Sequence, residues 1–448
     1  MFIKKFAPRL FSLFMVTALM VTVLATITPA SAQTTSDTAP ITVWVDAQRQ
    51  PMVDAYIKAF PDKGKLIKEV VVDRETFPQK VLLFNNTNQG WPDVVFAEPR
   101  LVGRVADTVH HFPLDLTGLV PADTLKAYDG ISNCTFGDKV YCLRNDVAPF
   151  VLFYNKTLMD KFKYTVPTTF EDLQALSDKV AKEHPGYLLG AFGDGWTFVA
   201  YFDAAGCPSH ELVDDSTLKI DMTDARCVSA AKLVDHMIAN KTMFTDAQGF
   251  FDPALAKQFT DNKVLLMSLP VWEWTSYQPK GSWDNKAGDH QIALAAPLKW
   301  AADTNPTTPA LGGSAWTVSN HTTNPKLAVD LVTWLTTSPD LWGAVPNVTA
   351  GGFPAYEPLQ AAWGKQTAAD PVWASDPLPA LQAAAKIISP LDKWPHFDLI
   401  SPFGQMVADA LQKKATIEST MHEVLDKLQP FAEAGNYVIV APTATPAK

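Results

Sequence analysis

The fold is decided by two runs of sequence, Ile41-Thr42-Val43-Trp44-Val45 and Asp93-Val94-Val95-Phe96-Ala97. Both are short and apolar, which predicts buried strands. A third strand is predicted at Val70-Val71-Val72, and helical patterns at residues 52–60 and 75–84 separate the three strands. Strands and helices that alternate in this order form a parallel sheet covered by helices. The predicted fold class is therefore α/β, in which ligands bind beyond the carboxyl ends of the strands.

A second alternating set of elements follows. Strand patterns occur at Phe150-Val151-Leu152-Phe153-Tyr154 and Val264-Leu265-Leu266-Met267-Ser268, and helical patterns fill residues 169–183 and 224–240. The chain returns to a strand at residues 315–319, after which helices dominate. A length of 448 residues suits two domains with substantial cores.

The first 32 residues are interpreted as a signal peptide. Lys4, Lys5 and Arg9 precede an apolar stretch, and Ala30-Ser31-Ala32 supplies the small residues of a cleavage site. A retained membrane anchor is the alternative, because the apolar stretch is nearly long enough to span a bilayer. No cysteine lies near the cleavage site, so we expect an exported chain without a lipid anchor, on the periplasmic or extracellular side of the membrane.

The four cysteines suit an oxidising compartment. Of the three possible connectivities, we predict the local one, Cys134 with Cys142 and Cys207 with Cys227, because Gly137-Asp138 supplies a turn inside the first pair. Zinc ligation is the alternative, but neither a Cys-x-x-Cys motif nor a nearby histidine pair accompanies these residues.

Composition and motifs argue against several classes of function. The formal net charge of −10 disfavours nucleic acid and anionic membrane surfaces as partners. The sequence has no Gly-x-Ser-x-Gly elbow, no His-Glu-x-x-His motif and no phosphate-binding glycine-rich loop. The pair His110-His111 is a poor metal site because adjacent side chains diverge. We therefore expect no enzyme activity, no cofactor and no metal ion.

Four stretches, in this order along the chain, resemble family 1 extracellular solute-binding proteins, the maltose-binding protein class of ABC importers. They are Trp91-Pro92-Asp93-Val94-Val95-Phe96-Ala97; residues 139–146 with Phe153-Tyr154-Asn155-Lys156; residues 262–274, which end in Pro270-Val271-Trp272-Glu273-Trp274; and Gly312-Gly313-Ser314-Ala315-Trp316-Thr317-Val318 with residues 324–328 and 334–335.

This resemblance implies a two-lobed, type II-like periplasmic-binding-protein fold. Each lobe would be a mostly parallel sheet flanked by helices, and hinge crossovers would join the lobes. The expected boundaries are 33–148 and 308–345 for lobe 1, 149–307 and 346–432 for lobe 2, and 433–448 for a flexible tail. The resemblance also implies a monomer that captures a small solute, a mono- or oligosaccharide, and delivers it to the permease subunits of an ABC transporter.

A sugar site needs flat aromatic faces and planar polar groups. Trp272 and Trp274 follow a predicted strand and flank Glu273, and the resemblance places Trp272 at a stacking position. Several candidates have structural alternatives: Asp46 as a helix cap, Asp146 as a brace of the hinge, Glu98 as a salt-bridge partner of Arg100, and Trp272 as a core residue. The full set of predicted ligand-binding residues is Asp46, Gln48, Glu98, Asp146, Trp196, Trp272, Glu273, Trp274, Gly352, Trp394 and His396.

Two other functions remain open at this point. A cage of aromatic rings and carboxylates also suits a polyamine or another small cation, through cation–π attraction. An exported glycan hydrolase is the alternative from a different class, although no spacing of carboxylates singles out an acid–base pair.

Overall fold

The computed structural model describes residues 35–73, 76, 80, 83–84, 87, 89–98, 112–214, 216–245, 249–250, 252–273, 292–344, 352–389 and 398–440. The predicted signal peptide and the candidates Trp274, Trp394 and His396 lie outside the described residues, as do His110 and His111. Within the described part, no helix is both long enough and apolar enough to cross a membrane.

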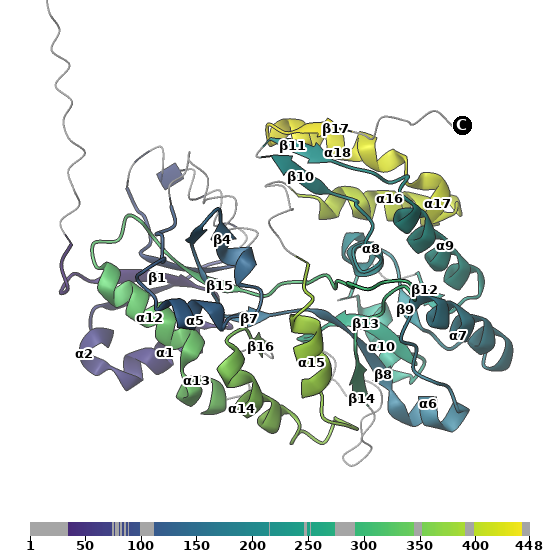
Figure 1. Cartoon of the computed structure of the whole chain (residues 1–448), viewed down its shortest axis with the longest axis horizontal. Coiled ribbons are helices and arrows are strands. Elements are labelled where there is room, and N and C mark those ends of the chain that lie inside the picture. The colour runs from purple at the N-terminus through teal and green to yellow at the C-terminus, as the bar shows by residue number, and fades with distance from the viewer. Residues whose placement is uncertain are drawn as a thin grey trace, which may run out of the picture. The chain divides into compact units, whose positions relative to one another are not determined.

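The first sheet contains the strands that the sequence predicted, and three of them are parallel. β1 (Ile41–Val45) pairs in parallel with β2 (Ile67–Val71) and with β3 (Val94–Ala97). β15 (Ala315–Val318) inserts antiparallel between β3 and β6 (Leu143–Arg144), which gives the order β2-β1-β3-β15-β6. Figure 1 labels β1 and β15 of this sheet. The α/β prediction is confirmed, and the late return to this sheet at residue 315 is confirmed with it.

Apolar residues cover both faces of this sheet. Val43 and Phe96 belong to the main core, where α1 (Gln50–Ala59) and α12 (Pro325–Thr337) pack. Val95 lies in a smaller cluster on the opposite face. A strand buried on both faces has no polar positions to alternate with apolar ones, which explains why β3 is a continuous apolar run.

The second sheet differs from the prediction. β8 (Phe150–Asn155) is its central strand and runs antiparallel to both β13 (Leu266–Pro270) and β14 (Ile292–Ala295). The expectation of a mostly parallel second sheet is therefore wrong for these strands, although β9 (Gly190–Ala191) and β12 (Met243–Phe244) pair in parallel. A fully buried strand has the same apolar sequence in either direction, so the pattern of residues does not reveal its orientation.

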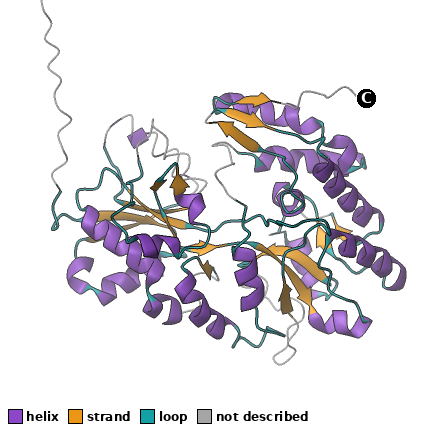
Figure 2. Ribbon diagram, in the orientation of Figure 1, coloured by secondary structure: helices purple, strands orange, loops and turns teal. Residues whose placement is uncertain are grey.

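Helices flank the strands of the second half (Figure 2). α7 (Phe170–Glu183) begins with a capping box between Thr169 and Asp172, and it packs on α9 (Ala225–Ala239). The other elements are α2 (Pro61–Gly64), α5 (Ala122–Lys126), η2 (Ile131–Cys134), β4 (Thr135–Phe136), β5 (Lys139–Val140), β7 (Asp146–Val147), α6 (Lys156–Phe162), α8 (Gly195–Phe202), α10 (Pro253–Thr260), α13 (Pro339–Ala344), β16 (Phe353–Pro354), α14 (Glu357–Thr367), α15 (Leu378–Ala385), α16 (Ile400–Lys413), α17 (Ile417–Thr420) and α18 (Glu423–Ala434).

Part of the expected flexible tail forms a strand. β17 (Val438–Val440) pairs in parallel with β11 (Thr217–Lys219), which is also paired with β10 (Glu211–Asp214). Ile439 lies opposite the buried Leu218, whereas Val438 and Val440 are exposed. The run Val438-Ile439-Val440 is typical of a strand. The prolines that follow it favoured the interpretation of the whole segment as a tail.

Both predicted disulfides are confirmed. Cys134 and Cys142 have their Cα atoms 5.1 Å apart, and Cys207 and Cys227 have theirs 4.5 Å apart. Gly137 adopts a φ of +63° between β4 and β5, which is the left-handed conformation that a tight hairpin requires and that glycine adopts without strain.

Denatured but unreduced protein should therefore show no reactive thiol in a thiol titration. The double substitution Cys207→Ser and Cys227→Ser opens a loop with a sequence separation of 20 residues and should lower the free energy of unfolding by about 3 kcal/mol on the loop-entropy argument. Two reactive thiols per unreduced chain would contradict the pairing.

Candidate functional site

Polar side chains gather at one edge of the first sheet. β1 and β3 end there at Val45 and Ala97, and Ala315 of the antiparallel β15 pairs with both Ala97 and Arg144. The residues just beyond these strand ends are Glu98, Asn145 and Ser314, with exposed fractions of 7%, 0% and 2%. Buried polar groups of this kind are costly unless they are hydrogen-bonded, so their partners define the site.

Asp146 is the centre of this hydrogen-bond network. Its Oδ1 accepts hydrogen bonds from the backbone N–H of Ser314 (3.1 Å), from the Ser314 hydroxyl and from Asn145 Nδ2 (3.0 Å). Asn145 Oδ1 in turn accepts a hydrogen bond from Trp316 Nε1 (3.1 Å). Asp146 is 3% exposed, so this carboxylate braces the chain, which was the structural alternative for this residue.

The network joins two passages of the chain. The outgoing segment (residues 145–150) leaves the first sheet for β8, and the return segment (residues 308–314) leads back to β15. Their backbones are hydrogen-bonded from Asn145 N to Ser314 O (2.8 Å), from Leu311 N to Ala148 O (3.2 Å) and from Phe150 N to Pro309 O (3.0 Å). The two segments therefore form one antiparallel ladder that carries the polar cluster.

Glycines make room for this cluster. Gly313 has a φ of +78°, and a Cβ added to it would lie 2.5 Å from Arg144 Nη2. A Cβ on Gly352 would lie 2.9 Å from the Asp146 Cβ, because β16 pairs with β7 next to Gly352. The predicted candidates Asp146 and Gly352 are thus brought together.

Trp272 is attached to the same return segment. It follows β13, is partly buried, and donates a hydrogen bond from Nε1 to Leu311 O (2.8 Å). Gly312 has a φ of +84°, and its Cβ position lies 3.6 Å from Trp272 Nε1. The indole is therefore held in one orientation beside the ladder. Glu273 follows it in the chain and is 1% exposed.

Asp46 and Gln48 lie beyond the end of β1 and are both bound to Arg49. Asp46 Oδ1 accepts from the Arg49 backbone N–H (2.9 Å), and Arg49 Nη1 donates to Asp46 Oδ2 (3.4 Å) and Gln48 Oε1 (2.5 Å). The Arg49 guanidinium also lies over the Phe96 ring at 5.2 Å from its centroid. Asp46 thus stabilises the turn before α1. It is not the N-cap residue of that helix, because the N-cap position is occupied by Arg49, whose side chain makes no capping hydrogen bond.

Trp196 belongs to a different layer of the structure. It lies on α8, which packs against α9 and α16. Asp194 caps this helix through a reciprocal capping box with Thr197. The structure therefore joins Asp146, Gly352 and Trp272 through contacts, places Glu98, Asp46 and Gln48 at the same sheet edge, and puts Trp196 on a helix of the second half.

Sequence reasoning missed Arg144, Asn145 and Ser314. Arg144 is fully buried, and its Nη2 donates to Asp146 O (3.1 Å). Burial lowers the pKa of its guanidinium to about 10, and the charges of Asp146 and Glu98 act in the opposite direction, so the side chain is cationic at neutral pH. The available signal was three consecutive polar residues, 144–146, between apolar strands.

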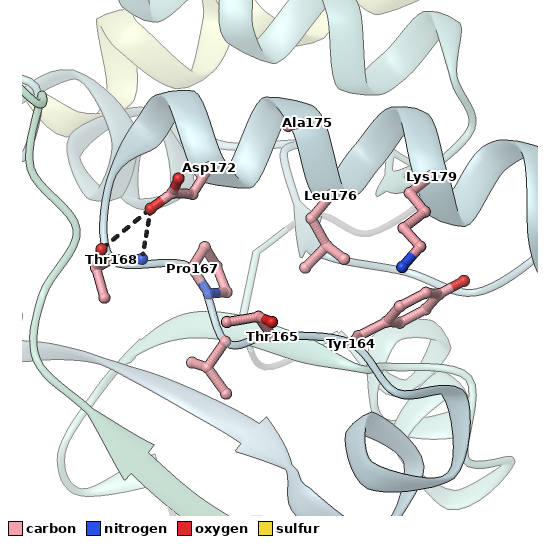
Figure 3. Close-up of a pocket in the computed structure, with 9 residues that line it drawn as sticks. Tyr164, Thr165, Pro167, Thr168, Asp172, Ala175, Leu176 and Lys179 are labelled. Atoms are coloured by element: carbon pink, nitrogen blue, oxygen red, sulfur yellow. Dashed lines mark hydrogen bonds between the residues drawn. The ribbon is translucent and has the colours of Figure 1, made fainter.

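A cavity of about 320 Å³ lies elsewhere, between residues 164–168 and α7 (Figure 3). Asp172 accepts hydrogen bonds there from the backbone and hydroxyl of Thr168, and Lys179 lies over the Tyr164 ring. These polar groups are engaged in capping and in ring contacts, and none of the predicted ligand-binding residues that the structure describes lines the cavity. Over the described part of the chain, no group of three or more His, Cys, Asp or Glu side chains is placed to hold a metal ion.

Comparisons with known proteins give a family and a fold. The sequence profile of a family described as bacterial extracellular solute-binding protein matches residues 52–371. A search of curated protein sequences finds no match.

Several solved structures share the fold. The GacH receptor of Streptomyces glaucescens, solved alone and with acarbose, is 18% identical with a TM-score of 0.65, covering 90% of this chain and 100% of that chain. The galacto-N-biose-/lacto-N-biose I-binding protein of an ABC transporter from Bifidobacterium longum is 18% identical with a TM-score of 0.67 and the same coverage. The sugar-binding protein MalE of Xanthomonas citri is 12% identical with a TM-score of 0.70, covering 88% and 98%. These likenesses confirm the predicted binding-protein fold.

Gly313→Ala tests the close packing around Arg144, and Gly118→Ala is its matched control. Both glycines have φ near +80°, but no atom of the described part of the chain lies within 4 Å of a Cβ on Gly118. The control should lower the free energy of unfolding by about 1–2 kcal/mol through backbone strain alone. Gly313→Ala should lower the free energy of unfolding by a further 1–3 kcal/mol or so, because the added methyl group overpacks the buried Arg144 guanidinium. Equal losses in denaturant titrations would contradict the close approach.

Proposed function

Because the chain belongs to the family of bacterial extracellular solute-binding proteins, we propose that it captures a mono- or oligosaccharide outside the cytoplasm and delivers it to the permease subunits of an ABC transporter. The observation that carries this proposal is the fixed indole of Trp272 beside a sheet edge lined with carboxylates. An aromatic face stacks on the C–H face of a sugar ring, and carboxylates accept hydrogen bonds from its hydroxyls. The solved structures of similar fold include complexes with acarbose and lacto-N-biose, which supports a saccharide for this chain.

The proposal includes the domain organisation inferred from the sequence. Residues 33–148 and 308–345 would form one lobe, and residues 149–307 and 346–432 the other. The outgoing and return segments would then be the crossovers at which the lobes rotate, as hinge proteins do around a ligand. Consecutive positive φ angles at Gly312 and Gly313 support a hinge there, because glycine tolerates large backbone changes.

The same proposal covers export. Residues 1–32 would direct the chain out of the cytoplasm and would then be removed. The mature chain would act as a monomer and would carry no lipid anchor. The two disulfides support an oxidising destination.

A thermal-shift panel of maltose, maltotetraose, lacto-N-biose and β-1,6-galactobiose tests the solute class, with spermidine as the contrasting cation. A saccharide present at one hundred times its dissociation constant should stabilise the folded protein by about 2.7 kcal/mol through mass action. The saccharide should be recovered unchanged after incubation. Stabilisation by spermidine alone would replace the sugar with a cation, and release of hydrolysis products would indicate an enzyme.

Trp272→Ala should weaken binding of that saccharide about tenfold or more, since stacking on an aromatic ring contributes roughly 1–3 kcal/mol. Trp272→Phe keeps a stacking face but loses the hydrogen bond to Leu311 O, so it should weaken binding less. Trp342→Ala is the control: this tryptophan is 1% exposed, and its loss should cost about 3–5 kcal/mol of stability without changing affinity. Titration calorimetry and thermal unfolding distinguish these outcomes. Unchanged affinity in Trp272→Ala would remove Trp272 from the site.

A further inference from the structure

Arg144 carries a buried positive charge with few direct partners. Its side chain is fully buried at the end of β6, in register with Ala315. Nη2 donates to the backbone oxygen of Asp146, whereas Nε and Nη1 have no hydrogen-bond partner among the residues that the structure describes. Buried arginines are usually paired and hydrogen-bonded through most of their donors.

Stability alone does not account for this arginine. Replacing buried charged residues with apolar residues of similar volume is often neutral or stabilising. Leaving donors of a buried guanidinium unpaired adds a further cost. Two neighbouring glycines accommodate this side chain. Gly313 and Gly130 both have positive φ, and a Cβ on either residue would approach the Arg144 guanidinium.

The charge of Arg144 acts on the carboxylates of the proposed site. Among the described residues, the charged groups that interact with it electrostatically are Asp146 and Glu98. These lie beyond β6 and β3, on either side of β15. Both carboxylates are more than nine-tenths buried, and two buried anions at one sheet edge need a compensating cation.

We propose that Arg144 is a positioning residue of the solute site, whose guanidinium compensates the charges of Glu98 and Asp146, so that Glu98 can be buried where solute hydroxyls meet it and Asp146 can brace the ladder beside it. This inference rests on the proposed function for the solute, but the charge compensation can be measured without any solute. Arg144 acts through the two carboxylates and need not touch the saccharide. Its effect on binding should therefore depend on charge more than on shape.

Thermal unfolding of Arg144→Met between pH 5 and pH 8 tests the compensation directly. Without the cation, the folded state buries two uncompensated negative charges, and burial without a compensating cation disfavours the charged form of any carboxyl group, increasingly so as the pH rises. The melting temperature of Arg144→Met relative to the wild type should therefore drop more at pH 8 than at pH 5. Arg144→Lys should show a smaller dependence, and adding Glu98→Gln to Arg144→Met should recover part of the loss at pH 8.

Affinity is the second measurement, made with the panel saccharide that stabilises the wild-type protein most. Arg144→Met should weaken binding about tenfold or more at pH 7, as expected when a charge-assisted contact is displaced, and Arg144→Lys should stay within about threefold of the wild type. Arg226→Met is the matched control, because Arg226 is paired with Asp303 and bound to Ala205 O, away from this cluster. Its affinity should equal that of the wild type.

The outcomes separate the two proposals. A stability loss in Arg144→Met that is equal at pH 5 and pH 8 overturns the charge compensation, and unchanged saccharide affinity overturns the positioning role. If no saccharide of the panel stabilises the wild-type protein, the proposed function fails, while the pH dependence of unfolding still decides whether Arg144 compensates the two carboxylates. If Arg144→Met does not fold at pH 8 but folds at pH 5, the compensation is supported.

Discussion

The pairing of the outgoing and return segments is the constraint on which the rest of this structure depends. Backbone hydrogen bonds between Asn145 and Ser314, Ala148 and Leu311, and Phe150 and Pro309 fix where the chain leaves the first sheet and where it comes back. The Asp146 carboxylate locks this pairing at one end, because it accepts bonds from both the backbone and the hydroxyl of Ser314. The return segment then leads into β15, which lies between β3 and β6.

The same ladder explains why candidate residues from distant parts of the sequence converge. Trp272 is bonded to Leu311 of the return segment, Gly352 packs on Asp146, and Glu98 follows the strand that pairs with β15. Gly312 and Gly313 make this convergence possible. Both have a positive φ that would strain other residues, and a Cβ would approach Trp272 at Gly312 and Arg144 at Gly313. The pairing of the outgoing and return segments thus fixes the path of the chain and brings the candidate residues together.

Sequence patterns predicted the features that depend on local chemistry. The β1–β3 strands follow from apolar runs and the disulfides from cysteine spacing, and the structure confirms both. The antiparallel β8–β13 pairing and β17 depend on partners far along the chain, and nothing local encodes strand direction. Arg144 was missed for a related reason: an arginine in a polar triplet suggests the surface, and only the packing of Gly130 and Gly313 around it reveals its burial.

Magnitudes indicate what kind of cluster this is. A hydrogen bond to a charged group contributes about 1.5–3 kcal/mol, and an unpaired buried donor costs a comparable 1–3 kcal/mol or so. The three bonds received by Asp146 are therefore opposed by the two unpaired donors of Arg144 and by the desolvation of both groups. An apolar edge would hold the two segments together without these costs, but it would offer no hydrogen-bond acceptors to a hydroxylated solute. This balance supports the proposal that the polar cluster serves solute binding rather than stability.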